Sequence, residues 1–247
     1  MPESGRLTPN QIETVEHSGA TAAPWTVTGA GIHAVTFEVD TGAALNALPP
    51  MLSRPAPTYG RIYVIDYPDT PLGAYREALL MVSCRYLMMP RQYLVASIVD
   101  SEAARAANAQ NSHYRSEIGK ITLQASGNSA TSTIEGASGL KVTITSPDGA
   151  STSSDVLRYD PVVVVQPREG GLKVLTVSGA PENIREAFIA AGTTMQLQGG
   201  GADSPWVKLR SMFPITGTFA RLDVEVPLAK EVEMPPMMAA AAARSSS

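Results

Sequence analysis

The sequence predicts an α+β fold in which an antiparallel β barrel or sandwich carries a few short helices. Three observations support this prediction. Many short segments are rich in β-branched and aromatic residues, and turn signals separate them. Glycine (20 residues) and proline (19 residues) are plentiful, which is typical of strands joined by turns. Only three short stretches have the pattern of a helix.

The first predicted elements are a strand and a short helix. Apolar and polar residues alternate over 35–39, which indicates a half-buried strand that ends at Asp40. Asp40 has a side chain that suits a helix N-cap. We therefore expect a helix over 43–48, which the two prolines that follow it would end.

The middle of the chain is predicted to be a succession of strands. A strand is expected over 61–66, and a turn-rich loop follows at 68–73. Two long strands are then expected at 78–89 and 91–99, with a break at Pro90. Further strands are expected at 118–124, 132–135, 140–145, 161–166 and 172–178.

Two further helices and a closing strand complete the pattern. Asp100 or Ser101 is a suitable cap for an alanine-rich helix that runs to about Gln110. A helix is also predicted over 181–191, because its apolar residues would share one helical face and a glycine follows its end. A long strand is expected over 218–226, because apolar and polar residues alternate from Ala220 to Val226, which predicts one buried and one wet face.

Length and composition limit the possible classes of protein. A chain of 247 residues with 44% hydrophobic residues can bury a large core. We expect one domain over 23–233, between a flexible arm at 1–22 and a disordered, low-complexity tail at 234–247. The net charge of −4 without a basic stripe disfavours nucleic acid as a partner. No apolar run approaches the roughly 18 residues of a membrane-spanning helix.

The residues that usually bind metals or form disulfides are scarce. A single cysteine, Cys84, cannot form an intramolecular disulfide, which fits a reducing cytoplasm. The three histidines have no cysteine or aspartate neighbours at the spacing of a zinc site. We therefore expect neither a metal nor another cofactor.

Four segments form a pattern in a fixed order. The segment 40–52 contains Ala-Leu-Asn-Ala-Leu-Pro-Pro-Met-Leu, and 67–80 contains a Gly-x-Tyr-x-Glu motif that ends at Glu77. The segment 100–121 combines a helix, a turn and a strand, and 213–232 is a closing strand with an acidic end. Together they resemble the acetoacetate decarboxylase family, and the resemblance implies that family's fold over most of the chain.

The same comparison implies that the chemistry of this chain departs from the family. The family forms a Schiff base between a lysine amine and a keto substrate. Its paired lysines fall here on Ser116 and Glu117, its arginine falls close to Ala30, and an earlier glutamate falls near Ile62. Only the glutamate of the Gly-x-Tyr-x-Glu motif is retained, as Glu77. This chain is thus similar to a divergent member without the Schiff-base lysine.

The candidate catalytic residues are those at the matching positions. Desolvation of Glu77 could raise its pKa into a range useful for proton transfer. Arg115, Ser116 and Glu117 could bind an oxyanion and move a proton. The alternative is structural: Glu77 could pair with a neighbouring arginine, and the three turn residues could satisfy one another.

Further residues are candidates for a substrate pocket. His113 and Tyr114 lie beside the turn, and other aromatic and methionine side chains could line an apolar cavity. Core packing is the alternative for each of them. The candidate substrate-binding residues are His113, Tyr114, Tyr63, Tyr75, Met81 and Tyr93.

Three functions are compatible with these observations. The first is a non-Schiff-base enzyme that acts as a cyclase, isomerase or dehydratase on a keto- or polyene-containing natural-product intermediate. The second is a decarboxylase or aldolase-type lyase with a displaced lysine, although Lys120 lies about 13 Å beyond Ser116 on an extended strand. The third is a non-catalytic small-molecule-binding protein. The family resemblance also implies a homo-oligomer.

Overall fold

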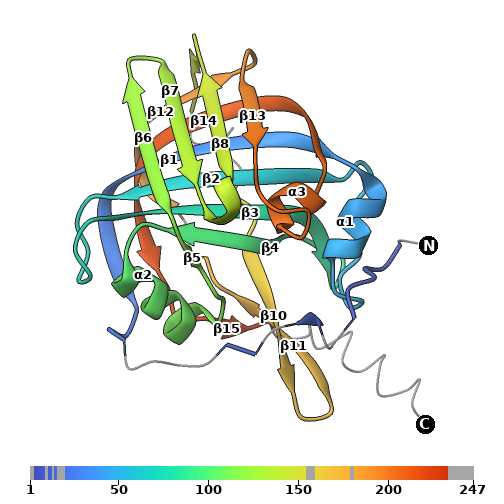
Figure 1. Cartoon of the computed structure of the whole chain (residues 1–247). Coiled ribbons are helices and arrows are strands. Elements are labelled where there is room, and N and C mark those ends of the chain that lie inside the picture. Colours follow the sequence, from blue (N-terminus) through green and yellow to red (C-terminus); the bar gives the residue numbers. More distant parts are fainter. Residues whose placement is uncertain are drawn as a thin grey trace.

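The structure is a computed structural model that describes residues 3–8, 11–12, 14–15, 20–153, 159–178 and 181–232. In this part of the chain, two β-sheets and a few short helices form the fold (Figure 1). Side chains of the smaller sheet, such as Ile134 and Ile144, share a hydrophobic core with Val35 and Leu80 of the larger sheet. The two sheets therefore form a sandwich, as predicted.

The larger sheet is mixed and open. Two strand pairs in it, β10 with β4 and β5 with β4, are parallel, and its other pairs are antiparallel. The order of its strands has two ends, so the sheet does not close into a barrel. Its strands, in spatial order, are β15 (Lys230–Glu231), β11 (Gly171–Thr176), β10 (Val162–Arg168), β4 (Met89–Val99), β3 (Tyr75–Tyr86), β2 (Tyr59–Tyr67), β1 (Trp25–Val39), β14 (Ser211–Val226), β12 (Pro181–Ala190) and β9 (Ala150–Ser151), with β5 (Glu117–Ile118) beside β4.

The smaller sheet and the helices cover the larger sheet. Figure 1 shows β6, β7, β8 and β13 standing across the larger sheet, and the β10–β11 hairpin projecting from the opposite side of the molecule. The strands of the smaller sheet, in order, are β13 (Thr194–Gln198), β8 (Lys141–Ser146), β7 (Ser129–Glu135) and β6 (Lys120–Ser126). The helical elements are α1 (Thr41–Ala47), α2 (Glu102–Ala107), a π-helical turn η2 (Asn108–Ser112), a 3₁₀ turn η3 (Ala137–Gly139) and α3 (Pro205–Lys208). Among the described residues, these helices are too short or too polar to cross a bilayer.

The central strands are buried on both faces, so successive residues belong to different cores. On β2, Ile62 and Val64 pack beneath the smaller sheet, whereas Tyr63 and Ile65 pack on the opposite face. This second face is covered by α2. Burial on both sides explains why these strands are nearly continuous apolar runs.

The local signals at the helix starts are confirmed. Asp40 Oδ1 accepts a hydrogen bond from the Ala43 N–H at 2.8 Å, which caps α1. Ser101 Oγ accepts from the Ala104 N–H at 3.4 Å and caps α2. The two predicted long strands are present as β3 and β4, which pair as a hairpin, although Pro90 lies inside β4 rather than between the strands.

The predicted helix over 181–191 is wrong, because this segment forms strand β12. It pairs with β14, and Phe188 stacks on Phe219 with ring centroids 5.5 Å apart. The spacing of its apolar residues suits one helical face, but β14 pairs with Pro181, Glu182 and the residues from 186 to 190, and this tertiary pairing decides the conformation. The strand β13 and the helix α3 were not predicted.

The described part of the predicted arm lies against the domain. The backbone N–H groups of Gly5, Arg6 and Leu7 donate to carbonyl groups of Leu52, Leu45 and Leu48 at 2.7–2.9 Å. A side chain at Gly5 would clash with the Leu48 carbonyl, so glycine permits this close approach. The predicted tail at 234–247 lies outside the described residues.

Candidate active site

A small cavity lies on the sheet face that α2 covers. Its volume is about 90 Å³, and its wall comes from β2, β3, η2, residues 159–162 and the end of β14. One water molecule needs roughly 10–15 Å³ of such a cavity, so the cavity can hold several waters or a ligand of a few heavy atoms.

Glu77 is the buried carboxyl group in this cavity. It lies on β3, and only 3% of its surface is exposed. Its Oε1 accepts hydrogen bonds from Asn108 Nδ2 at 2.7 Å, Tyr114 Oη at 2.9 Å and Ser97 Oγ at 3.0 Å. None of the described residues donates to Oε2. One carboxyl oxygen is thus fixed by three donors, and the other remains available to a ligand.

Ser116 closes a hydrogen-bonded ring with these residues. Its Oγ accepts the second N–H of the Asn108 amide at 2.9 Å and lies 2.9 Å from Ser97 Oγ. Since the Ser97 hydroxyl donates to Glu77, the Ser116 hydroxyl must donate to Ser97 Oγ. We call Glu77, Ser97, Asn108 and Ser116 the Glu77 ring.

The irregular end of the α2 helix positions this ring. The helix widens into the π-helical turn η2, and His113 then takes a left-handed conformation with φ of 55°. Asn111 Nδ2 donates to the Thr21 carbonyl at 2.9 Å, and Gln166 Nε2 donates to the His113 carbonyl at 2.8 Å, so both sides of the turn are fixed. π-helical turns and left-handed non-glycine residues are enriched at functional sites.

Burial controls the protonation of the site. Desolvation raises the pKa of Glu77, and the hydrogen bonds from Tyr114, Ser97 and Asn108 partly oppose this effect. Burial also raises the pKa of Tyr114 well above its ordinary value, and the nearby Glu77 charge adds to the rise. Its phenol therefore stays protonated at neutral pH and remains a donor.

The structure brings five of the predicted site residues together. Glu77, Tyr114 and Ser116 share the hydrogen-bond network described above. Tyr63 and Tyr75 line the same cavity, as do Glu77 and Tyr114. Ser116 does not line the cavity itself but contacts Glu77 indirectly, through Ser97 and Asn108.

The other predicted site residues lie elsewhere. Arg115 and Glu117 are exposed and, with His113, line a separate groove. Met81 is fully buried on the cavity side of β3 but does not line the cavity. Tyr93 packs on the opposite face of the sheet and lines the groove.

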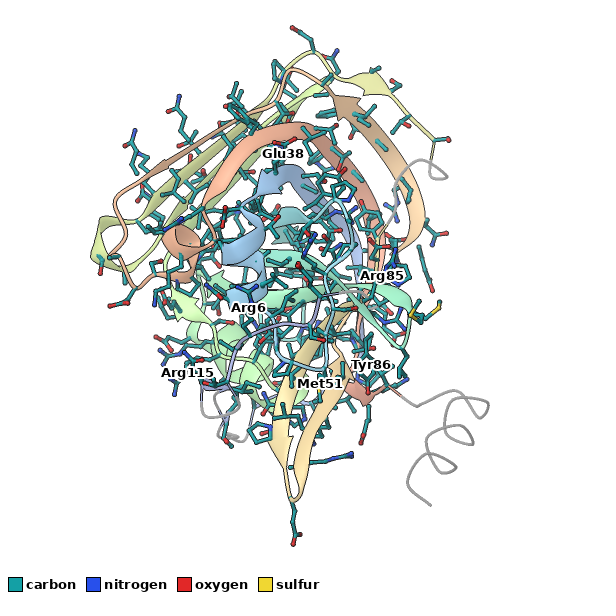
Figure 2. The ribbon with its side chains drawn as sticks, turned by 90° about the vertical axis from the view of Figure 1, so that its right-hand side faces the viewer. Arg6, Glu38, Met51, Arg85, Tyr86 and Arg115 are labelled. Carbon is teal, nitrogen blue, oxygen red and sulfur yellow. The ribbon has the colours of Figure 1, made fainter. Side chains whose placement is uncertain are left out.

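The groove has a volume of about 1330 Å³ and lies between α1, α3, β4 and the N-terminal segment. Arg6 and Arg115, both labelled in Figure 2, line it. Leu94 and Tyr114 line both the groove and the small cavity, so these two side chains form part of the partition between them.

All five lysines of the chain lie in the described residues, and none is buried or lines the small cavity. Lys208 lines the groove, where its Nζ lies 2.9 Å from Asp203 Oδ1. No group of three potential metal ligands occurs among the described histidine, cysteine, aspartate and glutamate residues. The lysines are Lys120, Lys141, Lys173, Lys208 and Lys230.

Sequence reasoning missed two members of the Glu77 ring and part of the cavity wall. Ser97 is a polar residue within an apolar strand, and Asn108 interrupts an alanine-rich helix, so each carried a weak signal. The contact between Ser97 and Glu77 depends on the strand register. Ser97 of β4 pairs with Leu79 of β3, which lies two residues after Glu77 on the same strand. Among the unpredicted lining residues are Tyr67, Tyr159 and Asp160.

The fold is shared with solved acetoacetate decarboxylases. The crystal structure of acetoacetate decarboxylase from Legionella pneumophila has a TM-score of 0.73 and 18% identity, with 92% of each chain covered. A second acetoacetate decarboxylase structure has a TM-score of 0.74 and 18% identity, and covers 92% of this chain and 94% of that one.

An enzyme from a biosynthetic pathway has a similar fold. The enduracididine biosynthesis enzyme MppR complexed with pyruvate has a TM-score of 0.69 and 14% identity, and covers 94% of this chain and 98% of that one. No functionally curated protein matches the chain by sequence. The family model for acetoacetate decarboxylase (ADC) matches residues 10–155, which is more than half of the chain. The chain therefore belongs to the acetoacetate decarboxylase family.

Proposed function

We propose that this protein is an enzyme that transfers protons next to the carbonyl group of a small substrate without a covalent amine intermediate. The observation that carries this proposal is Glu77, a carboxyl group buried in a cavity, with one oxygen fixed by three donors and the other open to a ligand. The reaction class is an isomerisation or a dehydration.

The chemistry follows from the position of Glu77. Its Oε2 would accept a proton from the carbon next to the carbonyl group, and the C–H electron pair would move into the carbonyl to give an enol or enolate. The same proton would return to a second carbon in an isomerisation, or to a departing β-hydroxyl in a dehydration. A carboxyl group whose pKa is raised by burial is suited to both directions of transfer.

The phenols around the cavity supply the complementary hydrogen bonds. Tyr63 and Tyr75 line the cavity, and burial raises the pKa of each phenol. A neutral phenol in a dry site is an effective donor to the oxygen on which negative charge develops. Cavity volume restricts the substrate to a few heavy atoms, or to the reacting end of a larger keto-containing natural-product intermediate.

Ser116 supports this proposal over a lyase with a displaced lysine. Its hydroxyl takes part in the Glu77 ring, and no lysine lines the cavity among the described residues. The enduracididine biosynthesis enzyme MppR, whose structure contains pyruvate, supports a carbonyl compound as the substrate of a protein with this fold. We further propose a homo-oligomer, as the family resemblance implies.

Deuterium exchange tests the proposal. We would incubate butan-2-one and pentane-2,4-dione with the protein in D₂O and follow the loss of α protons by NMR. The wild type should accelerate exchange, and Glu77→Gln should lower the enzymatic rate at least about 100-fold, the usual contribution of a general base.

The matched control is Glu38→Gln, the same chemical change at an exposed glutamate that lines neither cavity. This variant should retain the wild-type rate. Equal rates for wild type and Glu77→Gln, or no acceleration by the wild type with any carbonyl compound that binds in the cavity, would favour the alternative of a non-catalytic binding protein.

A further inference from the structure

The charged side chains on the wall of the small cavity are all acidic among the described residues. Glu77 lies inside, Asp160 lies in the segment after β9, and Glu225 is exposed on β14. Arg61 offsets Asp160, since its Nη1 lies 3.4 Å from Asp160 Oδ2, whereas Glu77 receives only uncharged donors. Ionised Glu77 therefore gives the cavity a negative potential.

Phenol side chains surround this negative charge. The cavity is lined by the rings of Tyr63, Tyr67, Tyr75, Tyr114 and Tyr159. Two pairs of these rings are in contact: Tyr63 and Tyr159 meet edge to face at 6.0 Å, and Tyr67 and Tyr75 are tilted at 4.7 Å between centroids. Aromatic rings attract cations and, together with carboxylates, form the sites that bind ammonium groups.

The phenols respond to the charge of Glu77. That charge contributes to the raised pKa of Tyr67, Tyr75 and Tyr114, after the larger effect of burial. An anionic ligand in the same space would experience the same repulsion and would lose its hydration without gaining a cation from the described wall.

We propose that this cavity selects carbonyl compounds by charge: it rejects carboxylates, such as keto acids, and favours compounds that carry an ammonium group. This inference rests on the proposed function, which requires a carbonyl group in the substrate. It adds the charge of the second functional group that the substrate carries. An enzyme that acts on keto acids would differ from this chain in the charge of the cavity wall as well as in its lysine.

Two pairs of matched ligands test the inference by protein-observed NMR titration at pH 7. Acetoacetate and pentane-2,4-dione differ by a carboxylate oxygen in place of a methyl group. Aminoacetone and butan-2-one differ by an ammonium group in place of a methyl group. We expect pentane-2,4-dione to bind at least tenfold more tightly than acetoacetate, and aminoacetone to bind more tightly than butan-2-one. Acetoacetate binding as tightly as pentane-2,4-dione, or more tightly, would overturn the inference.

Variants identify the source of the selectivity. Glu77→Gln should reduce the tenfold preference for pentane-2,4-dione to less than threefold, whereas Glu38→Gln, whose position is labelled in Figure 2, should leave it unchanged. Glu225→Gln, at an exposed position, should reduce the preference at least twofold and provides the test if Glu77→Gln does not fold. A preference that is unchanged in both cavity variants would refute the assignment.

These titrations measure binding without turnover, so their outcome is independent of the exchange experiment. A protein that exchanges α protons through Glu77 but prefers acetoacetate would overturn only the charge selectivity. A protein with the predicted selectivity but no exchange that depends on Glu77 would overturn only the proposed reaction.

Discussion

Acidification should destabilise the protein through a buried histidine between the two sheets. His33 on β1 is completely buried, with its Nδ1 2.8 Å from Ser132 Oγ on β7 and its Nε2 2.9 Å from Ser146 Oγ on β8. Ser146 Oγ in turn lies 2.9 Å from Thr193 Oγ1, whose hydroxyl donates to the Ala190 carbonyl. We call His33, Ser132, Ser146 and Thr193 the His33 cluster.

The directions of these hydrogen bonds specify a neutral imidazole. Since Thr193 gives its proton to a carbonyl group, Ser146 donates to Thr193 and accepts from His33 Nε2–H. Nδ1 is then the acceptor for the Ser132 hydroxyl. A second proton on the ring would lie on Nδ1, which would then donate to Ser132 Oγ instead of accepting from it. It would also place a positive charge between the two sheets.

The cost of that proton can be estimated from the pKa. Burial lowers the pKa of His33 from its ordinary value of 6.5 to about 4. The unfolded chain therefore binds more protons than the folded protein between these values, so the His33 contribution is complete above pH 6.5 and is lost as the pH falls toward 4. With 1.36 kcal/mol for each pKa unit, the free energy of unfolding should drop by about 3 kcal/mol between pH 7 and pH 4 from this residue alone.

Urea denaturation followed by circular dichroism measures this effect. The difference between wild type and His33→Gln isolates the histidine, because other groups titrate in both proteins. Glu77 has a raised pKa and acts in the opposite direction, since its contribution to stability grows as the pH falls through the folded-state pKa. The wild type should lose about 3 kcal/mol more than the variant between pH 7 and pH 4. Parallel stability curves for the two proteins would refute the reasoning.

Three further substitutions probe the His33 cluster and the hydrogen bonds around Glu77. Gly217→Ala would place a methyl group against two hydroxyl groups of the His33 cluster and should cost about 1–3 kcal/mol of unfolding free energy in urea denaturation. Tyr114→Phe removes a donor that lowers the pKa of Glu77, so the acid limb of the pH–rate profile for α-proton exchange should move to higher pH. Ser116→Ala leaves an N–H of the Asn108 side-chain amide without its acceptor and should lower the free energy of unfolding by about 1–3 kcal/mol. A thermal stability equal to that of the wild type would contradict the hydrogen bonds assigned to the Glu77 ring.

The elements that could be predicted from the sequence are those whose signals lie within a few residues of the element itself. The caps Asp40 and Ser101 act through hydrogen bonds within one turn, so the sequence alone located both helix starts. The strand β12 depends instead on pairing with β14, and the paired residues, from Ala190 with Gly217 to Pro181 with Val224, are 27 to 43 positions apart in the chain. A pattern that fits one helical face could not reveal that partner.

A β-bulge explains why only part of the site was predictable. The register of β4 against β3 shifts between Leu80 and Met81, so Leu94 lines the small cavity and Ser97, three residues later, donates to Glu77. Strict alternation would place Tyr93 and Ser97 on one face, whereas Tyr93 packs on the other. The position of Glu77 could be taken from a motif, but its partners depend on this register.

The central claim is that the cavity works without a covalent amine. Its most direct test is the intact mass of the protein after borohydride treatment, under conditions in which the wild type exchanges the α protons of butan-2-one. Borohydride reduces an imine to a stable adduct, so an unchanged protein mass is the predicted result. A mass increase by the reduced ketone, located on any one of the five lysines, would contradict the account.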